Sequence, residues 1–274
     1  MPETVERSFR YGQETVLLPI PPQAKLFEYN EPTHRVSQQK FSQNLEQLIG
    51  KREVAGNIAV VVADKTRLCG YERILPWTVQ TLRSCGISEK QICFYIGYGT
   101  HPRQTDDECF AAYGDLYNSY RFVHHDCSDD GCFTTLGTTS YGTHAKVRRD
   151  VIESGLIITI GTVSHHYFAG YGGGRKLLFP GLAEKKSIYA NHRLFLDNEQ
   201  MQLAAGCWPG NLADNPLALD LKEIHDLLPD YLSIHALLDS SGKPADYYFG
   251  SSYNDFLAVC TKLDPCYKLQ LDER

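Results

Sequence analysis

The chain has 274 residues, of which 42% are hydrophobic and 22% are charged, and its formal net charge is −6. This apolar content excludes a disordered chain, and the length suffices for one large domain or two smaller ones. The excess of acidic residues argues against a nucleic-acid partner, because nucleic-acid-binding surfaces carry a stripe of basic residues. An anionic ligand would therefore have to be bound by a local group of residues.

Nine cysteines are scattered along the sequence, and the two closest together, Cys127 and Cys132, lie in a segment rich in Ser, Asp and Gly. The odd number and the lack of a Cys-x-x-Cys pair argue against a disulfide framework and a zinc knuckle. The N-terminus is charged from Glu3 and contains no apolar signal segment, and no apolar run approaches the ~18 residues of a membrane span. We therefore expect a cytoplasmic protein with no membrane partner.

The elements expected from the sequence begin with a polar lead-in segment, 1–50, that contains a strand over 15–20 and a helix over 36–49. The apolar, β-branched run over 57–63 is typical of a strand buried on both faces of a parallel sheet. Helices and strands then alternate: a helix over 74–85, a strand over 91–96, a helix over 105–113 with a capping box, a strand at 122–123, a helix over 147–154, strands over 156–160, 231–238 and 247–249, and a helix over 251–263.

This alternation predicts an α/β fold with a doubly wound, mostly parallel, Rossmann-like sheet and helices on both of its faces. In such sheets ligands bind outside the carboxyl ends of the strands. Three polar segments follow predicted strands, at 64–67, 100–103 and 165–176. Because the topology brings strand ends to one edge, we expect these segments to form one site.

The segment from His165 to Gly181 contains five glycines, at 170, 172, 173, 174 and 181, next to Arg175 and Lys176. Glycines allow backbone N–H groups to approach an anion closely, so the segment is a candidate phosphate cradle. It matches neither a Walker A loop, because Leu177 follows the lysine, nor the dinucleotide-binding glycine pattern. A simple glycine-rich turn with solvated charges remains an alternative.

Lys176 has two interpretations, a nucleophilic amine with a lowered pKa or a lysine that pairs with a phosphate. Three histidine positions lie in or beside the expected site: His101, His166 or its neighbour His165, and His192. A single imidazole is more often structural than catalytic, but several at one edge favour acid–base chemistry or metal ligation. No spacing indicates a closed zinc site, although a metal held mainly by a cofactor would leave no such pattern.

Four blocks of the sequence resemble, in order, the N-terminal domain of the lactate racemase family that uses the nickel-pincer nucleotide. These are Asp64-Lys-Thr-Arg67, Gly99-Thr-His101, the block from His166 to Lys176, and Ala190-Asn-His192, with a weaker match at Gly210-Asn-Leu212 and Asn215. The resemblance extends from about residue 50 to 260. It implies that residues 1–274 form a lactate-racemase-like N-terminal catalytic domain.

The resemblance also implies a role for each site residue in the racemisation or epimerisation of a 2-hydroxy acid. His101 and His166 would be the acid–base pair on the two faces of the substrate carbon, while the α-hydride moves to the cofactor and returns. Arg67 would hold the substrate carboxylate, and Asp64 and Thr66 would support these groups or the cofactor phosphate.

The implied cofactor is pyridinium-3-thioamide-5-thiocarboxylic acid mononucleotide with its nickel ion. By resemblance, Lys176 would be joined to it through the thioamide and His192 would ligate the nickel. The nucleotide would be accommodated by Gly170, Gly172, Gly173, Gly174 and Arg175.

Two departures from the family pattern bear on function. His101 is followed by Pro102-Arg103, where the family usually has Arg-Pro, which moves a cation by one position and bears on substrate choice. The family normally has a C-terminal lid domain after this one, and we expect this chain to lack it. The alternative function is therefore a non-catalytic or split-enzyme subunit that binds the nucleotide, its partner a chain supplying the lid or a second copy. A phosphate-binding α/β enzyme such as a sugar-phosphate isomerase is a third hypothesis.

Overall fold

The computed structural model describes residues 4–12, 14–27, 30–50, 52, 54–197 and 199–268. The chain divides into two compact units, Met1–Asn30 and Glu31–Arg274. The first unit contains one antiparallel hairpin of β1 (Val5–Tyr11) and β2 (Glu14–Ile20), so the strand expected over 15–20 is confirmed. The second unit contains all the other elements.

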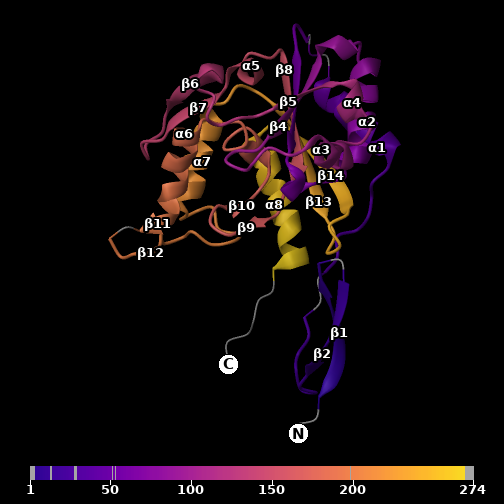
Figure 1. Ribbon diagram of the computed structural model, residues 1–274, viewed down its shortest axis with the longest axis vertical. Helices are drawn as coiled ribbons and strands as arrows, with labels where there is room; N and C mark the ends of the chain where they lie inside the picture. The colour runs from indigo at the N-terminus through magenta and orange to yellow at the C-terminus, as the bar shows by residue number, and fades with distance from the viewer. Residues whose placement is uncertain are drawn as a thin grey trace. The chain divides into compact units, whose positions relative to one another are not determined.

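A six-stranded sheet with the order β14-β13-β8-β3-β4-β5 forms the centre of the second unit (Figure 1). Its strands are β3 (Ile58–Ala63), β4 (Ile92–Gly97), β5 (Arg121–His124), β8 (Leu156–Thr162), β13 (Leu232–Leu238) and β14 (Pro244–Gly250). All neighbours pair in parallel except β14, which is antiparallel to β13. All six residues of β3 are buried, as its unbroken apolar run predicts. The predicted α/β, mostly parallel fold is confirmed.

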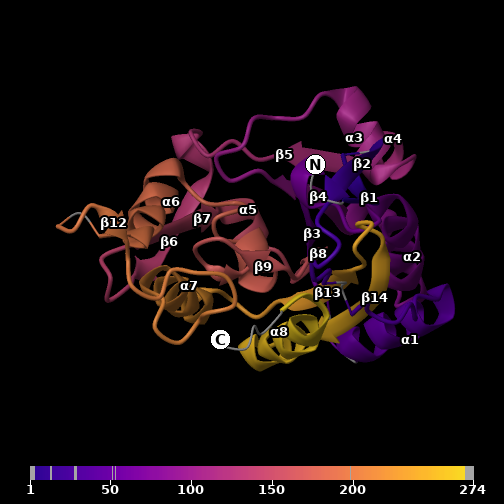
Figure 2. The same cartoon turned by 90° about the horizontal axis from the view of Figure 1, so that it is seen from below.

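Helices cover both faces of this sheet. They are α1 (Gln38–Ile49), α2 (Tyr71–Ser84), α3 (Asp106–Tyr113), α4 (Leu116–Ser119), α5 (Arg149–Ile152), α6 (Lys185–His192), α7 (Pro216–Leu227) and α8 (Tyr253–Tyr267). Figure 2 shows α1 and α2 on one side of the sheet, and α8 with the segment from β6 to α7 on the other. The short turns are η1 (Lys65–Arg67), η2 (Glu89–Gln91), η3 (Asp130–Cys132), η4 (Gly174–Leu177) and η5 (Arg193–Phe195).

The helix predicted over 147–154 is confirmed only for residues 149–152 and is wrong at 147–148. Residues 144–148 form the strand β7 (His144–Arg148), which pairs with β6 (Phe133–Thr138), and only α5 is helical. Alternate residues of β7 are buried, which is the period of a strand. Its tertiary partner β6 therefore decides the conformation of a segment too short to show a clear helical period.

Several elements were not expected from the sequence, among them α6, α7 and the short hairpins of β9 (His165–His166) with β10 (Gly170–Tyr171) and β11 (Leu196–Asp197) with β12 (Gln202–Leu203). The signal for α7 was present, because Asn215 caps it through a bond from the Ala218 N–H and Pro216 occupies its first turn. The capping box of Thr105 and Glu108 on α3 is confirmed.

All nine cysteines are free thiols. None of the helices in the described part of the chain is long and apolar enough to span a membrane.

Tyr71 ties the first turn of α2 to two neighbouring strands of the sheet. Its side chain is fully buried, and its hydroxyl accepts a hydrogen bond from the Ala63 N–H and donates one to the Ile160 carbonyl, both at 2.7 Å. The two bonds connect Ala63, the last residue of β3, to Ile160 near the end of β8. The polar segments expected to form the site follow these two strands.

We expect Tyr71→Phe to lower the free energy of unfolding by roughly 1–3 kcal/mol, because two buried backbone groups lose their partner. Urea unfolding followed by circular dichroism measures the change. Tyr11→Phe, at an exposed tyrosine, is the control and should change stability by less than about 0.5 kcal/mol. Equal stability of Tyr71→Phe and the parent chain would contradict the expectation.

Candidate active site

The parallel register of the sheet brings the predicted polar segments together. Ala63 at the end of β3 lies opposite Gly97 at the end of β4, and Val62 lies opposite Ile160 of β8. A cavity of about 160 Å³ opens at this edge. Eight of the twelve predicted site residues line it: Asp64, Arg67, His101, His166, Gly172, Gly173, Lys176 and His192.

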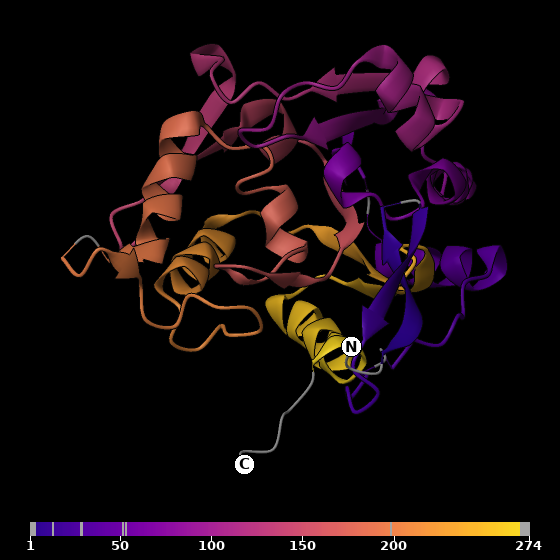
Figure 3. The same cartoon turned by 60° about the horizontal axis from the view of Figure 1, so that its bottom comes forward.

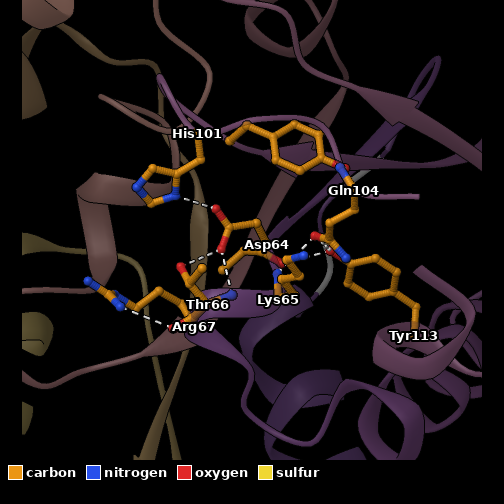
Figure 4. A network of polar contacts seen from close by, with 9 residues as sticks. Asp64, Lys65, Thr66, Arg67, His101, Gln104 and Tyr113 are labelled. Carbon is orange, nitrogen blue, oxygen red and sulfur yellow. Dashed lines mark hydrogen bonds and ion pairs between the residues drawn. The ribbon is translucent and has the colours of Figure 1, made fainter. Parts of the chain in front are cut away.

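Asp64 and His101 form a hydrogen-bonded pair on the cavity wall (Figure 4). The Nδ1 atom of His101 lies 2.6 Å from Oδ2 of Asp64, which is 4% exposed. The other oxygen, Oδ1, accepts from the backbone N–H of Thr66 at 2.7 Å and from its hydroxyl at 2.6 Å. Thr66 itself does not line the cavity but holds the carboxylate that does.

The pKa values of this pair move in opposite directions. Burial alone would raise the pKa of Asp64, but the hydrogen bonds from His101 and Thr66 lower it below its usual range. The hydrogen bond to Asp64 raises the pKa of His101, against the effects of burial and Arg67. The proton between the two groups therefore belongs to Nδ1, and Nε2 is the atom available for acid–base chemistry.

The structure distinguishes His166 from His165. The two residues form β9, and successive residues of a strand point to opposite sides. His166 lines the cavity, whereas Nε2 of His165 lies 3.0 Å from Oδ1 of Asp264, which also accepts from the Tyr171 hydroxyl at 2.7 Å. His165 thus anchors the β9–β10 hairpin to α8, and His166 is the imidazole that faces the site.

His166 is in a different electrostatic environment from His101. Its Nδ1 accepts from the backbone N–H groups of Phe168 at 3.3 Å and Ala169 at 3.2 Å, so the proton of the neutral ring is on Nε2. Burial and the charges of Lys176 and Arg67 lower its pKa to about 3. The cavity therefore contains one imidazole that favours protonation, His101, and one that resists it, His166, which can donate a hydrogen bond from Nε2.

The glycine-rich turn has two functions in the structure. Gly172 and Gly173 line the cavity, and a Cβ at Gly173 would lie 2.6 Å from the Thr162 carbonyl oxygen. Gly170 and Gly174 lie away from the cavity lining and serve packing: added Cβ atoms would meet the Asn211 carbonyl oxygen at 2.2 Å and the Phe256 ring at 3.0 Å. Figure 3 shows the turn of η4 between the sheet and α7.

The structure places Arg175 apart from the cavity lining. Its side chain is 2% exposed, and its guanidinium carbon lies 4.9 Å from the centre of the Phe256 ring and 5.4 Å from that of Tyr253. Its three guanidinium nitrogens have no hydrogen-bond partner among the described residues. Arg175 therefore acts on the site through its charge rather than through direct contact.

Lys176 lies next to this buried charge and extends into the cavity. Its pKa is lowered to about 7, mainly by burial and then by the positive charges of Arg175 and Arg67. A lysine with this pKa is partly neutral at physiological pH, and a neutral amine is the nucleophilic form. The environment thus favours the nucleophilic interpretation of Lys176 over a simple charge pair.

His192 is the last residue of α6 and lines the cavity. Burial and Lys176 lower its pKa to about 4, while the nearby Ile188 carbonyl opposes this. The preceding residue, Asn191, donates its Nδ2 to the buried Asp220 of α7 at 2.7 Å, which fixes the end of α6. A neutral, partly desolvated imidazole is the form that ligates metals.

The described part of the chain contains no group of three or more His, Cys, Asp and Glu residues placed to hold a metal ion. Arg67 and Lys176 are the two cationic residues of the cavity lining, and Arg103 is exposed outside it. Other lining residues were not predicted from the sequence, including Tyr98, Thr162, Ser164, Pro180 and Ile188. Thr162 ends β8 and Ser164 follows it, so the rule that ligands bind at strand ends could have found both, whereas Ile188 comes from the unexpected α6.

The fold and the cavity together define a doubly wound α/β protein with a ligand site at the carboxyl edge of its parallel strands. Residues 11–204 match the family model described as the lactate racemase N-terminal domain. The chain belongs to this family.

Two curated relatives are both called lactate racemase. The protein of Lactiplantibacillus plantarum is 30% identical over 167 residues, which cover 60% of this chain and 38% of the relative. The protein of Thermoanaerobacterium thermosaccharolyticum is 28% identical over 206 residues, covering 74% of this chain and 47% of the relative. The chain therefore spans less than half the length of each of these relatives.

Solved structures support the fold. The lactate racemase apoprotein of Thermoanaerobacterium thermosaccharolyticum is similar with a TM-score of 0.78 at 23% identity, covering 96% of this chain and 63% of the other. A Thermotoga maritima protein is similar with a TM-score of 0.67 at 17% identity, covering 86% of this chain and 59% of the other.

We expect the reactivity of Lys176 toward acetic anhydride to rise with pH through a midpoint near 7, because the neutral amine appears above its lowered pKa. Brief labelling at a series of pH values, followed by peptide mass spectrometry, measures it. The exposed Lys90 in the same digest is the internal reference. A Lys176 profile that runs parallel to that of Lys90 would show that the cavity does not activate this amine.

Proposed function

We propose that this chain is the N-terminal catalytic domain of a racemase or epimerase that acts on a 2-hydroxy acid with a lysine-linked nickel-pincer nucleotide. The observation that carries the proposal is the convergence of His101, His166, Lys176 and His192 on one cavity. Membership of the lactate racemase family and the names of its relatives support it. We place the activity in the cytoplasm, as the composition suggested.

The residues present fit this cofactor. Covalent attachment needs an amine that is neutral near pH 7, and Lys176 has a pKa of about 7 in the cavity. A metal held mainly by an organic ligand needs few protein donors, and His192 offers one buried, neutral imidazole. The nucleotide would approach the backbone at Gly172 and Gly173. When bound, this group supplies an acceptor that takes up and returns the α-hydride of the substrate.

The chain's own residues supply binding and proton transfer. Arg67 would hold the substrate carboxylate, since a guanidinium binds a carboxylate through paired N–H groups. His101 would accept the hydroxyl proton at Nε2, because Asp64 stabilises the resulting imidazolium. His166, whose neutral ring has its proton on Nε2, would donate a hydrogen bond to the oxygen of the planar keto acid. The proton held by the His101 imidazolium would return to that oxygen to complete the hydroxyl group of the product.

A second candidate function is a nucleotide-binding subunit that needs another chain for turnover. It is based on the presence in this cavity of the residues proposed for covalent attachment and metal ligation, Lys176 and His192. Closure over an active site excludes water and completes substrate contacts, so turnover would depend on a second chain that covers the cavity while this chain holds the cofactor. A lid-supplying chain or a second copy of this chain would then be the partner.

Four alanine variants test the roles proposed for the residues of the cavity. We expect Lys176→Ala to abolish covalent loading and His192→Ala to reduce nickel content. His101→Ala and His166→Ala should load normally and lose at least about 100-fold in kcat, the usual contribution of a general acid or base. Intact-protein mass spectrometry, nickel analysis and a lactate racemisation assay of protein co-expressed with cofactor-forming enzymes measure these effects.

Lys90→Ala, at an exposed position, is the matched control for loading. A parent chain without an adduct on Lys176 or nickel would refute the first proposal. A parent chain that loads but turns over no 2-hydroxy acid until the C-terminal region of a relative is added as a second chain would establish the second. Full activity of both histidine variants would contradict the assigned roles.

A further inference from the structure

Gln104 is a buried residue in an otherwise exposed loop. It follows His101 by three positions, and His101, Pro102, Arg103 and Thr105 are all exposed, whereas Gln104 is only 3% exposed. A glutamine this buried usually has hydrogen-bond partners, and here its Oε1 has them whereas its Nε2 has none among the described residues. Its contacts therefore show why the loop turns inward at this point.

The side chain of Gln104 reaches across to the loop that carries Asp64. Its Oε1 accepts the backbone N–H of Lys65 at 2.8 Å and lies 3.4 Å from the Tyr113 hydroxyl. That hydroxyl also donates to the Ala63 carbonyl at 2.9 Å. Figure 4 shows Gln104 and Tyr113 on one side of Asp64 and His101 on the other. One amide oxygen thus binds the residue directly after Asp64.

The backbone of Gln104 is held from the opposite direction. Its N–H donates to the Tyr98 hydroxyl at 3.3 Å, and that hydroxyl is bonded to Nδ1 of His124 at 2.8 Å. The rings of Tyr98 and His124 are stacked, with centres 5.9 Å apart. The loop after β4 is therefore fixed both to its own strand end and to the loop after β3.

The Asp64–His101 bond joins the same two loops, which contain two further contacts of different strength. Lys65 forms an ion pair with Glu108, but both side chains are exposed, and exposed pairs contribute little. The Lys65–Gln104 bond is partly buried and ends on a 3%-exposed side chain, so it is better placed than the ion pair to hold the two loops together. A neutral amide suits this place, because a carboxylate there would add a second negative charge near Asp64.

We propose that Gln104 is a positioning residue that sets the separation of the loops after β3 and β4, and thereby the contact between Asp64 and His101. It is hydrogen-bonded to neither Asp64 nor His101, and its contacts are with the Lys65 backbone and the hydroxyls of Tyr98 and Tyr113. Its importance for turnover rests on the proposed function. Its effect on the Asp64–His101 pair does not.

The test compares Gln104→Met with the parent chain and with Thr105→Ala. Methionine matches glutamine in length but removes the acceptor for the Lys65 N–H. Thr105→Ala removes the N-cap of α3 one residue away and destabilises the fold without changing that bond. Gln104→Asn, which withdraws the amide by one carbon, is the second variant if Gln104→Met does not fold.

The readout is the pKa of His101 in the chain without cofactor, measured by NMR titration of the imidazole and assigned with His101→Gln. Asp64 and Arg67 are the charged groups that act on His101. The other titratable groups of the cavity lining are Tyr98, His166, Lys176 and His192. The variants alter none of these groups, so a change in the pKa reports a change in geometry. Urea unfolding midpoints measure stability in parallel.

We expect Gln104→Met to lower the pKa of His101 by about half a unit or more, a roughly threefold loss of proton affinity. Thr105→Ala should lower the urea midpoint and leave that pKa unchanged. An unchanged pKa in both Gln104 variants would overturn the proposal, and so would an equal shift in Thr105→Ala.

Turnover separates this inference from the proposed function. If the loaded parent chain racemises lactate, Gln104→Met should reduce kcat by about tenfold and leave KM unchanged, because misplacement of a catalytic group affects the reacting step. A chain that turns over nothing but shows the expected shift in the pKa of His101 would refute the proposed function and support the positioning role.

Discussion

The parallel register of β3, β4 and β8 is the constraint on which the rest of the site depends. Because these strands run in one direction, with Ala63 opposite Gly97 and Val62 opposite Ile160, their following loops emerge at one edge. The Asp64–His101 hydrogen bond joins the loops after β3 and β4, and the glycine-rich turn after β8 contributes further residues to the cavity lining. Residues about 100 positions apart thus share one cavity without any local sequence relation between them.

Buried charge is the second organising feature. Arg175 is enclosed by aromatic rings, and its charge, together with burial and Arg67, disfavours a proton on Lys176. Lys176 in turn lowers the pKa values of His166 and His192. Around one cavity, only the imidazole that faces a carboxylate, His101, gains proton affinity. The cavity therefore combines nitrogens that tend to be neutral, on Lys176, His166 and His192, with the Asp64–His101 pair, which takes up a proton readily. This combination is the chemical basis of the proposed function.

The prediction of the fold succeeded where a pattern was long. The apolar runs of β3, β4, β8 and β13 and the capping box of α3 were each sufficient to locate an element. It failed at β7, at α6 and in the short hairpins around the glycine-rich turn. These segments have few residues, and their conformation depends on partners such as β6 and α7 rather than on local periodicity. The unexpected α6 is also the element that carries His192.

The sequence by itself determined the residue types of the site and the edge at which they meet, because strand order and loop position follow from hydrophobic pattern and chain order. It also left two matters open that only the tertiary structure decided. His165 and His166 differ in role because a strand points successive side chains to opposite sides, one toward Asp264 and the other into the cavity. Arg175 and Gln104 act from outside the cavity because packing buries them there, and burial depends on distant elements that no local pattern specifies.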